Sequence, residues 1–79
     1  MNVVTLIAST ITGLQSETGY AIVSPTGKLL LYDINGVQEI PAEDGGGSLV
    51  YVRGRDRPHR VMETVELVAA KVREARKGL

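Results

Sequence analysis

Residues 19–34, GYAIVSPTGKLLLYDI, contain the clearest structural signal in this chain. Two apolar runs flank residues 24–27, SPTG. Proline favours the second position of a type I turn, and glycine favours the positive φ of the bulge that closes such a hairpin. The stretch therefore predicts an antiparallel hairpin with strands at 19–23 and 28–34.

This hairpin would be apolar on both faces. Pairing across the turn predicts one face with Ala21, Val23, Leu29 and Leu31, and another with Tyr20, Ile22, Leu30 and Tyr32. Four or five strands span ~20 Å, whereas one helix covers only ~10 Å. We expect a helix to pack on the first face. The second face is then a partner or dimer face, most simply for a second copy of the chain, unless the sheet bends around its own core.

The segments around the hairpin predict further strands. Residues 3–12 are mostly β-branched, which favours a strand, although a helical apolar spacing is also present there. Residues 35–36, Asn-Gly, predict a two-residue turn that returns residues 37–40 as a third strand. Residues 42–48, with three consecutive glycines, predict a mobile loop, and residues 49–52 predict another strand.

The apolar period changes after residue 57. Val61, Val65, Val68 and Val72 recur at spacings of four and three, which is typical of an amphipathic helix. We expect this helix to span residues 57–77, with Gly78 ending it. The predicted fold is a single α+β domain over residues 1–79. An antiparallel meander of four to five strands within residues 1–53 is followed by one C-terminal helix on one sheet face.

Composition narrows the class of protein. The chain has 79 residues, no cysteine and one histidine, so it forms no disulfide and has no zinc-ligand spacing. No window has the ~18 apolar residues of a membrane helix, and the apolar N-terminus lacks the basic region of a signal peptide. We therefore expect a cytoplasmic protein that has no cofactor and no membrane contact.

Charge is distributed unevenly along the chain. Residues 1–52 carry one basic and five acidic side chains, whereas residues 53–79 carry eight basic and four acidic ones. Five candidate binding residues lie within residues 53–60, RGRDRPHR: Arg53, Arg55, Arg57, His59 and Arg60. Cations at the start of a helix oppose its dipole, so an anion or an acidic protein surface would explain them. The alternative is a solvated basic turn.

Catalytic patterns are absent from the sequence. His59 is the sole histidine, and no serine stands in a nucleophile motif, so we expect no enzyme. The alternative of nucleic-acid binding through the basic segment is disfavoured by zero net charge and by the lack of Trp and Phe. The sequence predicts a small macromolecule-binding protein that occupies a partner protein's surface. This is typical of phage or mobile-element inhibitors and adaptors.

Overall fold

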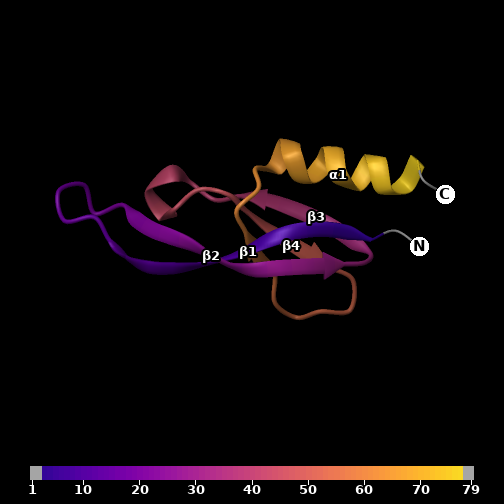
Figure 1. Ribbon diagram of the computed structural model, residues 1–79, viewed down its shortest axis with the longest axis horizontal. Coiled ribbons are helices and arrows are strands. Elements are labelled where there is room, and N and C mark those ends of the chain that lie inside the picture. Colours follow the sequence, from indigo (N-terminus) through magenta and orange to yellow (C-terminus); the bar gives the residue numbers. More distant parts are fainter. Residues whose placement is uncertain (1–2, 78–79) are drawn as a thin grey trace.

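A computed structural model describes residues 3–77 (Figure 1). Its elements follow the order β1 (Val4–Leu14), β2 (Ala21–Leu31), β3 (Ile34–Glu39), the 3-10 turn η1 (Ala42–Asp44), β4 (Ser48–Val52), β5 (His59–Val61) and α1 (Val65–Lys77). The strands form one antiparallel sheet in the order β2-β1-β5-β4-β3. The expected α+β class is confirmed: five antiparallel strands are followed by one C-terminal helix that packs on them.

The predicted hairpin within residues 19–34 is wrong. Residues 24–27 lie inside β2, a single strand of 11 residues that pairs with β1 from Val4 opposite Leu31 to Leu14 opposite Ala21. Pro25 is tolerated because β2 is an edge strand, and a register shift at Ala8/Ser9 absorbs the extra residue Thr26. Pairing with a long β-branched strand thus outweighs the local turn signal.

The chain reverses instead in the polar connection after β1. Gly19 has a φ of 74° and donates its N–H to the Gln15 carbonyl, while the Gln15 N–H donates to the Tyr20 carbonyl. The Thr18 hydroxyl accepts the Tyr20 N–H at 3.1 Å. These bonds close the β1–β2 ribbon.

The predicted turn at Asn35-Gly36 is also wrong. Both residues lie in β3, where the register with β4 shifts between Ile34 and Gly36. The Tyr51 side chain lies 3.6 Å from where a Gly36 Cβ would be, which is an ordinary contact distance, so Gly36 lies beside a paired strand at a register shift rather than in a turn. Strands β3, β4 and β5 form a meander, and β5 joins it to β1.

The helix begins at Val65 rather than at residue 57. His59, Arg60 and Val61 form β5, because strand pairing with β4 on one side and β1 on the other satisfies their backbone groups. Thr64 starts the helix: its hydroxyl accepts the Leu67 N–H at 3.3 Å. The described helix ends at Lys77, and Gly78 lies outside the described residues.

The core lies between α1 and the sheet. Its buried members are Val4, Leu6, Leu31, Val50, Val61 and Val68, and partly buried residues packed on it include Leu29, Val72 and Ala75. Leu29 and Leu31 thus pack toward the helix as predicted. Ala21 and Val23 do not belong to this core cluster, because they lie toward the other end of β2.

The glycine-rich segment after β3 is tied to its surroundings. The Gly45 and Gly46 N–H groups donate to the Ala42 and Pro41 carbonyls, and the Gly47 carbonyl accepts the Ile40 N–H at 3.2 Å. A Cβ on Gly47, whose φ is 78°, would overlap the Val61 carbonyl oxygen. Gly47 is therefore a position of close backbone approach. Within residues 3–77, no helix is long and apolar enough to cross a membrane.

Candidate functional site

The four residues of the predicted partner face are all partly exposed, but they do not form one patch. Ile22 and Leu30 lie eight residues apart in the same strand, which corresponds to ~26 Å at ~3.3 Å per residue. The prediction placed them opposite each other across a hairpin that does not exist. Tyr20 and Ile22 therefore belong to one apolar area, and Leu30 and Tyr32 to another at the far end of β2.

The first area lies on a projecting ribbon. The register of β1 with β5 consists of the single pair Ala8 and Val61, so beyond it β1 pairs with β2 alone. The molecule measures 48 × 22 × 19 Å, and Figure 1 shows the ribbon extending away from the end covered by α1. We call residues 9–25 the arm.

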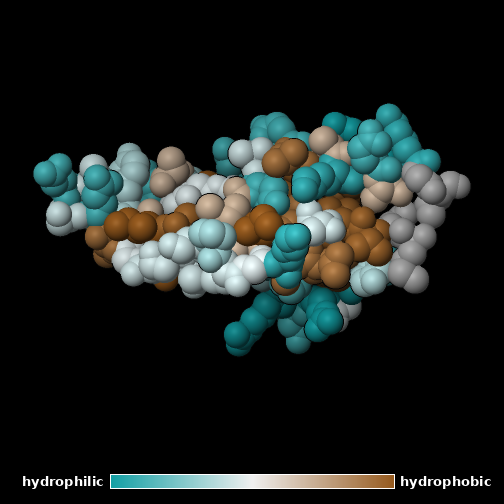
Figure 2. All heavy atoms as spheres, in the orientation of Figure 1, coloured by the Kyte–Doolittle hydropathy of each residue, from teal (hydrophilic) through white to brown (hydrophobic). Residues whose placement is uncertain are grey.

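Apolar side chains are exposed along the arm. They are Ile11, Leu14, Tyr20 and Ile22, with exposed fractions from 44% to 70%. Ile11 and Leu14 pair with Val23 and Ala21 and so share one face of the arm, whereas Ile22, which lies between Ala21 and Val23, is on the opposite face. Figure 2 shows apolar residues running out along this part of the molecule. A two-stranded ribbon has no core of its own, so these side chains meet water unless another molecule covers them.

The five basic-segment residues do not converge. Arg55 and Arg57 are exposed in the loop that follows β4, which lies on the side of the sheet opposite α1 (Figure 1). His59 and Arg60 are half-buried neighbours in β5. Because α1 begins at Val65, none of these cations stands in its first turn, and the dipole argument for an anion there does not apply.

Arg60 is engaged within the fold. Its guanidinium donates to the Asp44 backbone carbonyl, so it links β5 to η1. Its Nε is buried without a hydrogen-bond partner among the described residues. The sequence places Arg60 with the other arginines, but the structure uses it to hold the loop after β3.

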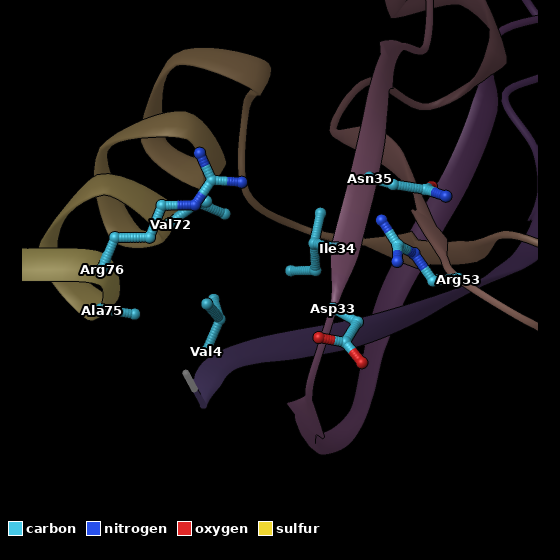
Figure 3. A pocket seen from close by; sticks show the side chains of 8 residues that line it. All are labelled: Val4, Asp33, Ile34, Asn35, Arg53, Val72, Ala75 and Arg76. Carbon is cyan, nitrogen blue, oxygen red and sulfur yellow. The ribbon is translucent and has the colours of Figure 1, made fainter. Parts of the chain in front are cut away.

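Arg53 faces a pocket of about 310 Å³ beside the helix. Figure 3 shows Arg53, Asp33 and Asn35 on one side, Arg76 from α1 on the other, and Ile34 between them. The remaining lining residues are apolar: Val4, Val72 and Ala75. Two guanidinium groups, one carboxylate and one amide thus share the hollow with apolar side chains. Sequence reasoning missed Arg76 because its approach depends on how α1 docks.

Sequence reasoning also missed the polar groups that secure the edge of β1. The buried Glu63 carboxylate accepts the Ile7 N–H, with oxygen distances of 3.0 and 3.1 Å. Lys71 Nζ donates to the Thr5 carbonyl at 3.0 Å, and the fully buried Ser48 hydroxyl donates to the Glu63 carbonyl at 2.7 Å. The Glu63 and Lys71 side chains stand where a strand next to β1 would otherwise pair, and Ser48 holds the Glu63 backbone in place, so their role is structural.

In the part of the chain that the structure describes, no group of three His, Cys, Asp or Glu side chains could hold a metal ion. His59 lies opposite Val50 in the sheet. The chain matches no protein-family model, no curated protein and no solved structure. Its function is therefore inferred from its own residues.

Proposed function

We propose that this chain is a non-enzymatic protein-binding module, of the inhibitor or adaptor kind, that acts by laying its arm against a surface of another protein. The observation that carries the proposal is the projection of the arm beyond the sheet with four partly exposed apolar side chains. An apolar surface of this kind gains free energy when a partner removes it from water.

The loop after β4 supplies a second contact. Arg55 and Arg57 are exposed, and guanidinium groups bind carboxylates in a bidentate fashion, so an acidic partner surface suits them. Rim charges of this sort mainly speed association and select the partner, whereas buried apolar residues supply most of the affinity. The cysteine-free composition suits a reducing compartment such as the cytoplasm.

The test is affinity capture from the source cells with three baits: the unaltered chain, Ile22→Glu in the arm, and Leu30→Glu outside it. Both substitutions place a carboxylate at an exposed apolar position of the same strand. We expect Ile22→Glu to lose the captured protein and Leu30→Glu to retain it. Equal capture by all three baits would remove the arm from the proposal.

Nucleic-acid binding is the competing outcome. Arg53, Arg55 and Arg57 lie at the end of β4 and in the loop that follows it, and phosphate contacts strengthen as salt is lowered. Titration of the chain with labelled single- and double-stranded DNA and RNA at low and moderate salt separates the two functions. Saturable, salt-sensitive binding that is lost in Arg55→Gln/Arg57→Gln would favour the nucleic acid over a protein partner.

A further inference from the structure

Resting on the proposed function of the arm, we infer that the protein surface it occupies is the arm of a second copy of this chain, so that two chains form a symmetric dimer. Three features of the arm lead to this inference: its charge, its strand edges and its lack of an internal core.

The arm is almost uncharged. Glu17, near the tip, is the only charged residue between residues 8 and 27, in a chain whose composition is 23% charged. A partner of opposite charge would be recognised by charges on the arm, and the arm offers only Glu17. A two-fold contact, by contrast, brings the same surface of both copies together, so each residue near the axis lies close to its own copy. Charged residues there would repel each other, and an uncharged surface is therefore favoured.

The two edges of the arm differ. The outer edge of β2 carries Pro25 in the arm and, directly after the arm, the extra residue Thr26 and the exposed Lys28, which all discourage pairing with another strand. The outer edge of β1 is covered by β5 only as far as the pair Ala8 and Val61. Closer to the N-terminus, Glu63 and Lys71 cover this edge, whereas residues 10–14 have no such cover among the described residues. This part of β1 carries one bulge, in which Thr12 is the extra residue between Ile11 and Gly13.

A second arm fits this edge. Two β1 strands that meet antiparallel about a two-fold axis would form a four-stranded sheet, β2-β1-β1-β2, across the dimer. Such a sheet pairs the outward-facing backbone groups of residues 10–14 on both sides of the Thr12 bulge and brings together Ile11 and Leu14 of both copies, which share a face of the arm. It also replaces an isolated two-stranded ribbon, which is marginal in water, with a sheet of stable width.

The first experiment compares Leu14→Glu with Leu30→Glu by sedimentation equilibrium of the purified full chain over a wide concentration range. The two leucines are 70% and 64% exposed, so both variants keep the fold, which far-UV circular dichroism verifies. We expect the unaltered chain and Leu30→Glu to show twice the monomer mass of 8.5 kDa. The dissociation constant of the Leu14→Glu dimer should be at least ~100-fold higher than that of the unaltered chain, because the substitution brings two carboxylates together in an apolar contact.

The second experiment uses the absence of cysteine. Each residue from 10 to 14 is replaced singly by cysteine and oxidised, with Arg57→Cys in the exposed loop as the matched control. A disulfide needs Cα atoms within ~7 Å of each other, and each step away from the two-fold axis separates a residue from its copy by ~6.6 Å. At least one arm position should therefore crosslink nearly completely into dimers, and the control should not.

The outcomes separate the inference from the proposed function. A monomer at every concentration, or equal dissociation of Leu14→Glu and Leu30→Glu, overturns the dimer. In that case, loss of the captured partner by Ile22→Glu would still support a protein-binding arm. A dimer that Leu14→Glu dissociates, together with capture that no arm variant changes, supports the dimer and rejects the arm as the contact for other proteins.

Discussion

Gly47 is the position at which one added methyl group should cost the fold most. The change is Gly47→Ala, and its matched control is Gly46→Ala in the same loop. Both glycines have positive φ, 78° at Gly47 and 70° at Gly46, so alanine at either position adopts the left-handed region at a cost of ~1–2 kcal/mol. The reduced entropy of the unfolded chain offsets part of this cost equally in both variants.

The two positions differ in their surroundings. A Cβ at Gly46 meets nothing within 4 Å, whereas a Cβ at Gly47 would overlap the Val61 backbone carbonyl and crowd that of Met62. Backbone cannot move aside without disturbing the β4–β5 pairing, and overpacking of this kind costs ~1–3 kcal/mol. We therefore expect Gly47→Ala to be less stable than Gly46→Ala by about 1–3 kcal/mol.

The assay is urea and thermal unfolding followed by far-UV circular dichroism, at one protein concentration because the proposed dimer would make Tm depend on concentration. At ~4–8 °C per kcal/mol for a domain of this size, the Tm of Gly47→Ala should lie at least ~4 °C below that of Gly46→Ala. Stabilities equal within about 0.5 kcal/mol would refute the close approach of Gly47 to β5.

Two further substitutions test the polar groups that secure β1 and the start of α1. Ser48→Ala leaves the buried Glu63 carbonyl without its 2.7 Å donor and should cost ~1–3 kcal/mol in urea unfolding, whereas the exposed Ser16→Ala should change stability by less than about 0.5 kcal/mol. Glu63→Ala removes the acceptor of the Ile7 N–H, and Glu63→Gln keeps one. Exchange of the Ile7 amide hydrogen, measured by NMR, should be faster in the alanine variant than in the glutamine variant; equal rates would show that the carboxylate does not protect this amide.

The fold class could be predicted because several of its strands and its helix have a local residue pattern, which does not depend on contacts with residues distant in the sequence. The β-branched run at residues 3–12, the apolar residues of β4 and the stripe from Val65 to Val72 each indicate their element locally. The strand order does not, because local turn chemistry at residues 24–27 and 35–36 competes with pairing to distant strands. In both places the distant pairing wins, and the glycine or proline is absorbed at a register shift or an edge.

The candidate site could be anticipated only in part. Tyr20, Ile22, Leu30 and Tyr32 are all exposed, but they lie in two separate areas, and this division depends on the true register of β2 with β1. The apolar spacing that predicts the helix includes Val61, although Val61 lies in β5. The predicted helix therefore began too early in the sequence, and Arg60 was assigned to its first turn. Contacts such as Glu63 with Ile7 join residues 56 positions apart and leave no signal in spacing.

The three-residue strand β5 has a consequence for the time course of folding. The β1–β2 and β3–β4 ribbons each join segments that are near in sequence, whereas β5 brings Val61 beside Ala8. Contacts between distant segments carry a large loop-closure entropy and form slowly. The two ribbons have no shared core until β5 lies between them and α1 docks. A chain in which β5 has not yet paired with β1 and β4 therefore has two separate ribbons rather than one sheet. The pairing of Val61 with Ala8 is expected to be a late and slow step of folding.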